Sequence, residues 1–445
     1  MYEYIVEQGG KVSDAMQAFR KFLGTNDMLA YLSMMAPRLI ELKRVLKPTG
    51  SIYLHCDPTA SHYLKQLLDA VFGVNQFMNE IIWSYGPKAT QRSISFQRKH
   101  DIIFFYTKHN GNHIFNSPLQ EYGQGSLAER HTRYKNQDEK GRYRWTTRRN
   151  SKGDKYRAKV YLNEGVVMTD VWNIPIINAT AKERLGYPTQ KPEALLECII
   201  NASSLEGDIV LDPFCGCGTT IVVAQKLNRR WIGIDITHLA IALIRHRLHS
   251  AFDYQTLDSD SGKVSSSLNY EVIGEPKDSS GAKALAEQDR YQFQWWSLGL
   301  VGARPIEEKK GADKGIDGRI YFHDEPTGKT KQIIVSIKSG NTSVSHIRDL
   351  RGVIERENAE IGVLITLQEP SQPMKAETSG AGFYKSEWGN HSRLQILTVK
   401  ELLEGKRIDR PPSQQADKTF KKAPKHVKES KGKTINWIEE SNNTD

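Results

Sequence analysis

Residues Ser204–Asp235 read SLEGDIVLDPFCGCGTTIVVAQKLNRRWIGID, and this stretch decides the fold. Asp208 to Leu211 is a short run rich in β-branched residues, which predicts a buried parallel strand. The apolar run from Thr219 to Leu227 predicts a helix, and Arg230 to Ile234 predicts a second strand. The stretch therefore predicts a strand–turn–helix–strand unit of an α/β sheet.

The turn of this unit has the residues that a nucleoside site needs. Gly216 and Gly218 allow the backbone to approach a ligand, and Asp235 at the tip of the second strand can accept hydrogen bonds from ribose hydroxyls. The third glycine of a dinucleotide fingerprint is missing, because Thr219 to Ile221 follow Gly218, and this disfavours a pyrophosphate cradle. A nicotinamide-type turn and a purely structural glycine turn are the alternatives.

Two motifs in this part of the chain resemble those of a known family. DPFCGCGTT resembles the AdoMet-binding motif of DNA amino-methyltransferases, and YPTQKP (187–192) resembles the motif that precedes it in the permuted, β-type members. The resemblance implies S-adenosyl-L-methionine (AdoMet) as cofactor. It is also consistent with Pro192 opening a helix whose N-terminal end suits a carboxylate. For two of the residues there is a simpler alternative: Thr189 is only a helix cap, and Lys191 is only a surface charge. The cofactor-binding residues implied are Thr189, Lys191, Asp212, Phe214, Gly216, Gly218, Thr219 and Asp235.

Composition agrees with a large protein that binds a polyanion. The 445 residues suffice for two or three domains, and the formal charge is +10 with a pI of about 9.1. The four cysteines are too few and too scattered for a disulfide framework, and Cys215 and Cys217 have no second Cys or His pair at metal spacing. No signal peptide or transmembrane run is recognisable, so we expect a cytoplasmic protein without a membrane partner.

The N-terminal quarter predicts more of the same α/β fold. Leucines near helical spacing predict a helix over 26–46 that Pro37 kinks or divides, and Ser61 caps a helix that ends near Phe72. Strands are expected at 51–55, 80–85 and 101–107, and we expect them to continue the sheet of the central unit. RVLKPTGSIYLHCD and KHDIIFFYTK resemble segments of the same family, in the family's order.

One motif of the family is absent from the sequence. The resemblance implies an Asp/Asn/Ser-Pro-Pro-aromatic tetrapeptide ahead of the first segment, which would hold the target amino group and stack on the flipped base. Asp57-Pro58-Thr59 and Asp212-Pro213-Phe214 lack the second proline, and Arg410-Pro411-Pro412-Ser413 has neither flanking residue. No catalytic residue is therefore identified. We expect that an N-terminal part has been lost, that cofactor binding is weakened, and that methyl transfer is absent or very slow.

A basic region separates the last of these strands from the TQKP motif. Residues 86–159 contain 17 Lys and Arg against 6 Asp and Glu, with interleaved aromatic residues. Lys and Arg suit phosphate contacts, and Arg can also reach guanine edges in the major groove. The resemblance places the target-recognition region here, and a solvated loop is the alternative. The candidate contacts to double-stranded DNA are Arg142, Arg144, Arg148 and Arg149.

The C-terminal part predicts a second, smaller domain. The linker before it has one possible strand at 270–273. In the domain a helix is expected over 282–298 with Trp295 and Trp296 as core, followed by two strands that carry Asp317 and, after a hairpin, Ser336 and Lys338. This pattern resembles the PD-(D/E)xK nuclease core of Mrr-like restriction endonucleases, in which an Asp and a Glu bind Mg²⁺ and a Lys activates water. Ser336 replaces the Glu and is a poor Mg²⁺ ligand, although Glu287 could supply a carboxylate. An active metal nuclease and an inactive fold both remain open.

The expected fold class is therefore α/β. It comprises an AdoMet-dependent methyltransferase (Rossmann-like) sheet with an inserted basic target-recognition region, and a smaller restriction-endonuclease-like domain. We expect a methyltransferase domain at 1–250 (target recognition at 86–165), a linker at 251–281, a nuclease-like domain at 282–405 and a disordered basic tail at 406–445. The expected function is site-specific methylation of the adenine N6 or, less often in the family, the cytosine N4 amino group in restriction–modification. The alternatives are a non-catalytic DNA-binding fragment and a Mg²⁺-dependent endonuclease.

Overall fold

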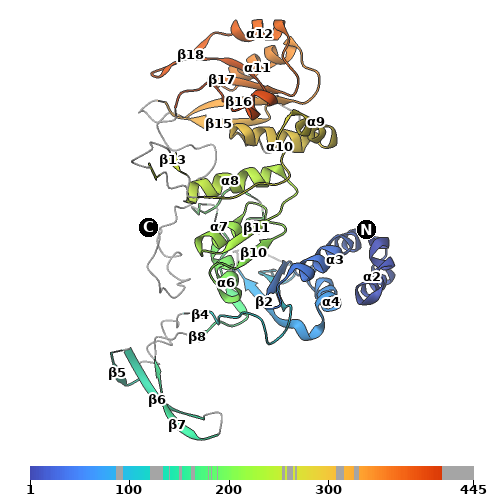
Figure 1. Ribbon diagram of the computed structural model, residues 1–445, viewed down its shortest axis with the longest axis vertical. Coiled ribbons are helices and arrows are strands. Elements are labelled where there is room, and N and C mark those ends of the chain that lie inside the picture. Colours follow the sequence, from blue (N-terminus) through green and yellow to red (C-terminus); the bar gives the residue numbers. More distant parts are fainter. Residues whose placement is uncertain are drawn as a thin grey trace.

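The computed structural model shows a chain extended along one axis (Figure 1). The C-terminal domain lies at one end, the glycine-turn unit in the middle, and a small sheet, β5–β7, at the other end. The residues that the structure describes are 1–86, 94–120, 134–139, 141–149, 153–161, 166–178, 180–181, 183–187, 189–252, 256–257, 264–265, 268–306, 315–324 and 330–412. None of the helices in these ranges is long and apolar enough to cross a membrane.

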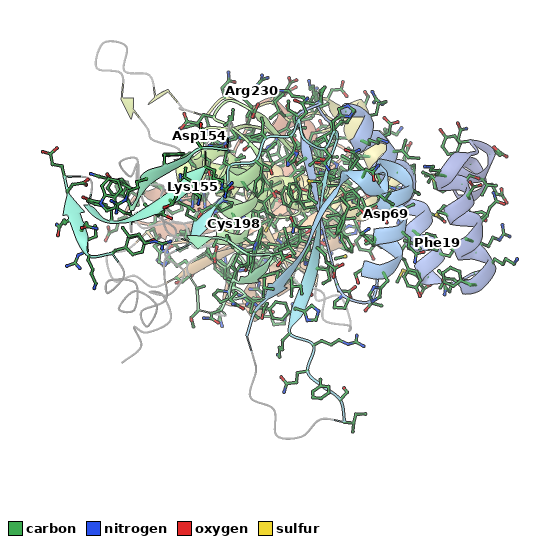
Figure 2. All side chains as sticks on the ribbon, turned by 90° about the horizontal axis from the view of Figure 1, so that it is seen from below. Phe19, Asp69, Asp154, Lys155, Cys198 and Arg230 are labelled. Carbon is green, nitrogen blue, oxygen red and sulfur yellow. The ribbon has the colours of Figure 1, made fainter. Side chains whose placement is uncertain are left out.

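Four helices form the N-terminal layer, and they pack on one face of the first sheet. Phe19 lies among these helices, whereas Lys155 lies on the outlying sheet at the opposite side of the view (Figure 2). Asn26 caps the third helix by accepting a hydrogen bond from the Leu29 amide at 2.9 Å. Pro37 lies inside this helix and does not divide it. The helices are α1 (Tyr2–Glu7), α2 (Gly10–Leu23), α3 (Asp27–Val45) and α4 (Ser61–Phe72).

The first sheet has the order β1-β3-β2-β9. β3 is antiparallel to both of its neighbours, with Leu54 opposite Phe104 and Ile81 opposite Ile103. The strands confirm the apolar runs expected from the sequence, with small shifts at their ends. They are β1 (Ser51–Cys56), β2 (Phe77–Ser84), β3 (His100–Thr107) and β9 (Val171–Asn173); the short 3₁₀ helix Val74–Gln76 precedes β2.

The central unit forms a second, separate sheet. β10 (Ile209–Asp212) and β11 (Arg230–Gly233) are parallel, with Asp212 opposite Gly233. α7 (Thr219–Lys226) joins the two strands. Before and after this unit come α6 (Glu193–Ser203) and α8 (His238–Phe252). The strand–turn–helix–strand prediction is confirmed. The expectation of one continuous sheet was wrong, because β1 and β10 do not pair in the described structure.

The basic region is described only in part. β5 (Asn136–Asp138), β6 (Gly141–Arg149) and β7 (Lys155–Tyr161) form an antiparallel three-stranded sheet. β4 (Leu119–Gln120) and β8 (Val166–Val167) form a short ladder on either side of it in the sequence. A second short ladder, β12 (Thr256–Leu257) with β13 (Val264–Ser265), lies in the stretch expected to be the linker.

The C-terminal domain is a five-stranded mixed sheet covered by helices. Its strand order is β14-β15-β16-β17-β20, and the hairpin that was expected to carry Asp317, Ser336 and Lys338 is present as β15 and β16. The strands are β14 (Arg304–Pro305), β15 (Gly318–Phe322), β16 (Lys331–Lys338), β17 (Ile361–Thr366) and β20 (Leu394–Thr398), with a separate hairpin of β18 (Phe383–Ser386) and β19 (Gly389–Ser392). The helices are α9 (Ser279–Gln288), α10 (Arg290–Val301), α11 (Val344–Arg356), α12 (Gln372–Ser379) and α13 (Val399–Leu403).

Two expectations for this domain were wrong. The helix expected over 282–298 is two helices, because the Asp289 side chain accepts from the Tyr291 and Gln292 amides and starts a new helix. Residues 270–273 form no strand. α10 packs on α8, and Gly299 lies so close to α8 that an added Cβ would be 3.4 Å from the Ala242 Cβ. The expected tail falls mostly at 413–445, outside the described residues.

Candidate functional site

The glycine turn joins the carboxyl end of β10 to α7. Gly216 and Gly218 have φ angles of 48° and 75°, in the left-handed region that favours glycine. A Cβ at Gly218 would lie 2.6 Å from Cγ1 of Ile244 on α8, and one at Gly216 would lie 3.1 Å from Cε1 of Tyr187. Packing against Ile244 is thus a second reason, besides its φ angle, for glycine at 218. Gly216 lies against the ring of Tyr187 in the YPTQKP segment.

Asp235 lies against this turn instead of pointing away from it. Its Oδ2 accepts a hydrogen bond from the Gly216 amide at 2.9 Å, and its Oδ1 accepts from the amide and hydroxyl of Thr237, both at 2.9 Å. A carboxylate has about four acceptor positions, so these three bonds leave about one for a ligand hydroxyl. The carboxylate thus holds the turn and the start of α8 in place while keeping one free acceptor position.

The other residues of the turn are held by local hydrogen bonds. The Asp212 side chain accepts from the Phe214 amide at 3.1 Å, and the Phe214 ring is 48% exposed at the carboxyl edge of β10. Cys215 and Cys217 are buried free thiols, and burial raises the pKa of Cys215 to about 12. Among the described residues no group of three His, Cys, Asp or Glu side chains that could hold a metal ion is found.

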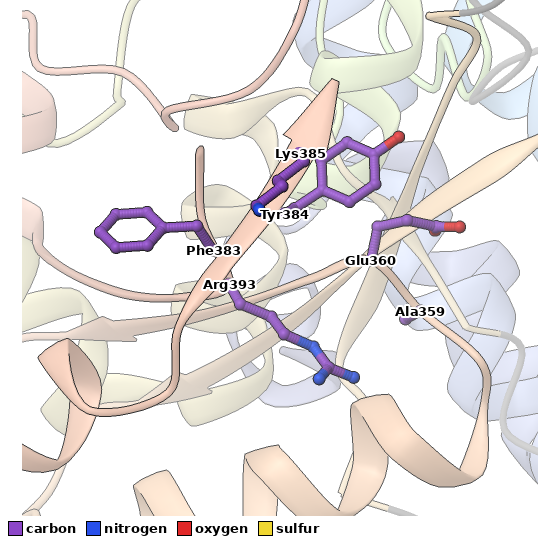
Figure 3. Close-up of a pocket in the computed structure, with 6 residues that line it drawn as sticks. All are labelled: Ala359, Glu360, Phe383, Tyr384, Lys385 and Arg393. Carbon is purple, nitrogen blue, oxygen red and sulfur yellow. The ribbon is translucent and has the colours of Figure 1, made fainter. Parts of the chain in front are cut away.

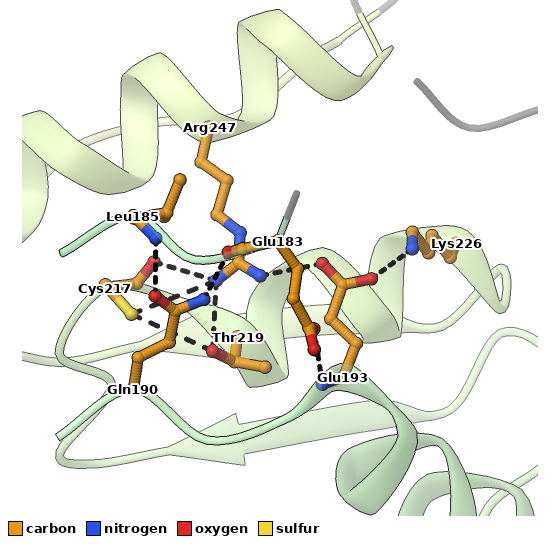
Figure 4. A network of polar contacts seen from close by, with 8 residues as sticks. All are labelled: Glu183, Leu185, Gln190, Glu193, Cys217, Thr219, Lys226 and Arg247. Carbon is orange, nitrogen blue, oxygen red and sulfur yellow. Dashed lines mark hydrogen bonds and ion pairs between the residues drawn. The ribbon is translucent and has the colours of Figure 1, made fainter. Parts of the chain in front are cut away.

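A buried polar network ties the YPTQKP segment to α6, α7 and α8 (Figure 4). Arg247 on α8 is 1% exposed and donates to Glu193 Oε1 at 2.7 Å and to Thr219 Oγ1 at 3.0 Å. Lys226 pairs with the other oxygen of Glu193. Burial alone would raise the pKa of Glu193, but Lys226 and Arg247 outweigh it and hold that pKa below its ordinary value. Glu193 is therefore ionised. It connects α6 to Lys226 at the C-terminal end of α7 and, through Arg247, to Thr219 at the start of α7.

Gln190 ties the YPTQKP segment to the backbone just before it in the sequence. The Gln190 side chain accepts from the Leu185 amide at 2.8 Å and donates to the Glu183 carbonyl at 2.6 Å. Pro192 is the N-cap of α6, not a residue of its first turn as expected. The Lys191 ammonium donates to the Thr189 carbonyl at 3.2 Å, and burial lowers its pKa. Lys191 is partly buried, and Thr189 is not the cap of α6, because Pro192 is.

A second polar group lies at the carboxyl end of β1, near Lys191. His55 Nε2 and Asp101 Oδ2 are 2.9 Å apart, and the Tyr85 hydroxyl donates to Asp101 Oδ1 at 3.4 Å. Burial lowers the pKa of His55, the nearby Lys191 lowers it further, and Asp101 opposes both. The histidine is therefore neutral near pH 7. Sequence reasoning missed this group because its members lie on three strands, up to 46 positions apart.

The sheet β5–β7 divides the candidate DNA contacts between two faces. Because side chains alternate along a strand, Arg142, Arg144 and Arg148 lie on one face of β6 and Arg149 on the other. On the Arg149 face, Lys159 lies 4.3 Å from the centre of the Tyr143 ring. Both faces therefore combine cations with aromatic rings, since Arg144 lies 5.5 Å from the Tyr134 ring centre.

The nuclease-like site differs from a metal centre. Asp317 accepts hydrogen bonds from Gln294 Nε2 at 2.9 Å, the Ile337 amide at 2.6 Å and Ser336 Oγ at 3.2 Å. Glu287 instead lies on the exposed side of α9, with Lys283 at 3.9 Å. In the described part of the chain, Asp317, Ser336 and Lys338 thus form no carboxylate pair for Mg²⁺.

The C-terminal domain also has a pocket of about 400 Å³ beside the β18–β19 hairpin (Figure 3). Tyr384 in its wall donates to Asp324 Oδ2 at 2.6 Å, and Lys331 pairs with Asp324 Oδ1 at 2.9 Å, so a buried ion pair anchors the hairpin. The lining residues are Ala359, Glu360, Phe383, Tyr384, Lys385 and Arg393.

A model of the DNA methylase family, N6_N4_Mtase, matches residues 10–245, which is more than half of the chain. The chain belongs to this family. The type II methyltransferase M.HpaI of Haemophilus parainfluenzae is 32% identical over 267 residues, which is 59% of this chain and 75% of that protein. The DNA adenine methyltransferase YhdJ of Escherichia coli (strain K12) is 33% identical over 216 residues, covering 48% of this chain and 66% of that protein.

Two further matches concern the C-terminal domain and the fold. Residues 291–404 match a model described as NACHT-associated inactive Restriction Endonuclease 1. Among solved structures, the M1.HpyAVI–SAM complex matches 48% of this chain and 82% of that chain at 20% identity, with a TM-score of 0.30, a likeness too low to compare the sites.

The DNA methylase match contains the glycine turn, the YPTQKP segment and Asp235 in one region. The residues of the polar network that sequence reasoning missed are Gln190, Glu193 and Arg247. A signal for Arg247 was available, because it follows Ala240 and Ile244 on the apolar side of α8 at helical spacing. Arginine at such a position is buried only when it is paired.

Proposed function

We propose that this DNA methylase binds AdoMet at the glycine turn and serves methylation of the adenine N6 amino group in double-stranded DNA. The observation that carries the proposal is the hydrogen bond between the Gly216 amide and Asp235, which places a carboxylate with a free acceptor position beside a glycine turn. The name of the E. coli relative, a DNA adenine methyltransferase, supports adenine over cytosine. The type II names of the relatives support a role in restriction–modification.

The residues at the turn fit the cofactor. Asp235 would accept a hydrogen bond from a ribose hydroxyl, and the exposed Phe214 ring would cover an adenine base. Lys191 and the N-terminal end of α6 would balance the methionyl carboxylate, while Thr189, Asp212, Gly218 and Thr219 would shape the site. AdoMet supplies a methyl group on a sulfonium, which the target amino nitrogen attacks directly, so that the site has to position the two atoms.

Within the 445 residues the tetrapeptide that would hold the target amino group is absent. We therefore propose that the chain by itself binds AdoMet but transfers methyl groups far more slowly than an ordinary enzyme.

For DNA, we propose that the sheet β5–β7 makes the main contacts. Its Arg142, Arg144 and Arg148 face would track phosphates, and Arg149 would reach the opposite side of the ribbon. The two long strands β6 and β7 form a ribbon, and a two-stranded ribbon fits the major groove; the sheet projects from the molecule in Figure 1.

We propose that the nuclease-like domain does not cut DNA. Ser336, a poor Mg²⁺ ligand, donates to Asp317 at the position where the resemblance implies a second carboxylate, and the match to an inactive restriction endonuclease model agrees with this. We accordingly assign no Mg²⁺ to Asp317 and Lys338. Mg²⁺-dependent cleavage that is lost in Asp317→Ala would overturn this assignment.

The test combines two measurements on the full chain. Calorimetry with AdoMet should show saturable binding that Asp235→Ala abolishes. Transfer of a labelled methyl group to mixed DNA, with digestion to nucleosides, should give little or no label. Any label should be N6-methyladenine, and N4-methylcytosine as the labelled product would overturn the adenine proposal. A failure to bind AdoMet would overturn the cofactor assignment.

A further inference from the structure

The β18–β19 hairpin of the C-terminal domain presents two large aromatic rings to solvent. Phe383 in β18 is 61% exposed, and Trp388 in the turn between the strands is 53% exposed. Single exposed apolar residues are common on protein surfaces, so their exposure alone indicates nothing. These two rings, however, belong to a hairpin that borders the pocket of about 400 Å³ and that is tied to the domain from its other face.

Polar groups anchor the inner face of the hairpin on both of its strands. On β18, the Tyr384 hydroxyl accepts a hydrogen bond from Lys331 Nζ at 2.6 Å and donates one to Asp324 Oδ2 at 2.6 Å. On β19, His391 lies directly opposite Tyr384, and its Nδ1 is 2.7 Å from Asp409 Oδ1. The hairpin is therefore fixed to the domain, and the side chains on its outer face are held in one arrangement.

The outer face and the pocket combine an aromatic ring with two cations. Because side chains alternate along a strand, Phe383 and Lys385 lie on the face of β18 opposite to Tyr384. Arg393, which directly follows β19, also lines the pocket. Neither the Lys385 ammonium nor the Arg393 guanidinium has an ion-pair partner among the residues that the structure describes. Both charges are therefore free to meet an anion.

The acidic residue of the lining does not balance these charges. Glu360 Oε2 accepts a hydrogen bond from the Gln332 amide at 2.9 Å, so this carboxylate is engaged with the backbone of β16. The pocket therefore favours a ligand that carries negative charge.

The pocket lies at the end of the sheet away from the nuclease-like residues. Lys331, which holds Tyr384, begins β16, while Glu360 directly precedes β17 and Arg393 directly precedes β20. The three strands are parallel, so the pocket lies at their amino ends. Ser336 is five positions along β16 from Lys331, or about 17 Å at about 3.3 Å per residue. The pocket is thus a site separate from Asp317 and Ser336.

The two kinds of group together select the class of ligand. A nucleotide has both a flat base for the ring and a phosphate for the cations. An acidic peptide would leave the ring unused, and an apolar partner would bury the two cations without a counter-charge. In Figure 3 the Phe383 ring and the Arg393 guanidinium point in different directions, so a ligand that touches both has to extend across the pocket. An extended nucleotide chain with unpaired bases has this form.

We propose that the β18–β19 hairpin and its pocket bind single-stranded DNA. An unpaired base stacks on Phe383, Lys385 and Arg393 hold neighbouring phosphates, and the Trp388 ring in the turn receives a further base. DNA is the expected strand because the chain belongs to a family of DNA methylases. The proposal gives the nuclease-like domain a binding role, and it does not depend on the AdoMet site.

The test follows hydrogen exchange of the full chain during titration with an oligothymidylate of about ten nucleotides. The amides of residues 383–392 should become protected, and the concentration at half protection gives the affinity of the hairpin separately from that of the β5–β7 sheet. The same oligonucleotide annealed to its complement should bind the hairpin at least about tenfold more weakly, because its bases are already stacked in pairs. Absence of protection, or equal protection by the duplex, would overturn the proposal. Stronger protection by an oligouridylate of the same length, or by polyglutamate, would also overturn it.

A matched pair of variants tests the aromatic ring. Phe383→Leu keeps an apolar side chain but removes the ring, so the affinity measured at the hairpin should fall roughly five- to hundredfold. The control is Phe22→Leu, because Phe22 is 60% exposed on α2 in the N-terminal layer. The control should bind as the native chain does. An unchanged affinity in Phe383→Leu, or an equal loss in both variants, would contradict stacking at the hairpin.

The two cations give a readout that does not depend on stability. Each phosphate contact to a single strand contributes about 0.7 to the slope of log affinity against log salt. Lys385→Gln should therefore reduce the slope at the hairpin by about 0.7, and Lys385→Gln combined with Arg393→Gln by about 1.4. Lys375→Gln, which changes an exposed lysine on α12, should leave the slope unchanged. A double variant with the native slope would show that no phosphate lies at these cations and would refute the proposal.

Discussion

Replacement of Arg247 by Met should destabilise the methylase domain more than any exposed charge change on the same helix. The guanidinium is 1% exposed and donates to Glu193, Thr219 and the Cys217 carbonyl at 2.7, 3.0 and 3.3 Å. Breaking a buried ion pair usually costs about 3–5 kcal/mol because the partner stays charged and buried. Here Lys226 still neutralises Glu193, so we expect the lower end, about 3 kcal/mol.

The measurement is urea unfolding followed by circular dichroism at pH 7. For a domain of this size about 3 kcal/mol corresponds to a fall of roughly 6–12 °C in Tm, which gives a second readout. Arg245→Met is the matched control, because Arg245 lies on the same helix with a 37% exposed side chain and pairs with Glu275. The control should change the free energy of unfolding by about 1 kcal/mol or less.

A double variant tests whether the cost comes from the network. In Arg247→Met combined with Glu193→Gln, no unpaired carboxylate remains, so the two costs should not add. We expect a coupling free energy of about 1–3 kcal/mol. Strict additivity, or a loss below about 1 kcal/mol for Arg247→Met, would show that the network does not hold the glycine turn to α8.

Four further outcomes follow from the same structure. The pKa of Glu193 is depressed in the folded protein, so its ionised form stabilises the fold above the ordinary glutamate pKa, and this contribution is lost as the pH falls through the folded pKa. The urea midpoint of Glu193→Gln should therefore decline less below about pH 4.5 than that of the native chain. Gly218→Ala should lower the free energy of unfolding, measured by thermal unfolding, by about 2–5 kcal/mol, because its Cβ would lie 2.6 Å from the Ile244 side chain. The control Gly302→Ala, at φ 67° with no atom within 4 Å, should cost about 1–2 kcal/mol. Arg144→Ala should reduce the slope of log DNA affinity against log salt by about one, without changing sequence preference, and a slope equal to that of the native chain would remove this residue from the phosphate contacts. Lys331→Met should lower the stability of the C-terminal domain by about 3–5 kcal/mol, because it leaves the Asp324 carboxylate, which is 1% exposed, without its cation. Hydrogen exchange of that domain measures the change.

The described contacts also give α8 a place between the two domains. Ile244 of α8 lies against Gly218, and Arg247 donates to Thr219 of α7. At the start of α8, the His238 amide donates to the Gln292 side chain of α10 at 3.0 Å. α8 therefore contacts both the glycine turn and a helix of the C-terminal domain.

Local sequence determined the central unit almost completely. Short β-branched runs, two glycines in a turn and an apolar helix interact over a few positions, so the strands 209–212 and 230–233 and the helix 219–226 followed from the pattern. Gly216 and Gly218 indeed adopt the left-handed conformation that their turn required. The hairpin that carries Asp317 was predictable for the same reason.

Tertiary structure decided the features that depend on distant residues. Arg247 and Glu193 are 54 positions apart, and the pairing that makes a buried arginine acceptable exists only once α6, α7 and α8 have packed together. The separation of β1 from β10 is likewise a property of strand pairing, which local periodicity does not encode. Side-chain alternation on β6 separated Arg149 from the other three arginines, although they cluster in the sequence. Sequence alone thus determined which segments form the site, and the packing of distant helices and sheet edges decided which polar groups meet there.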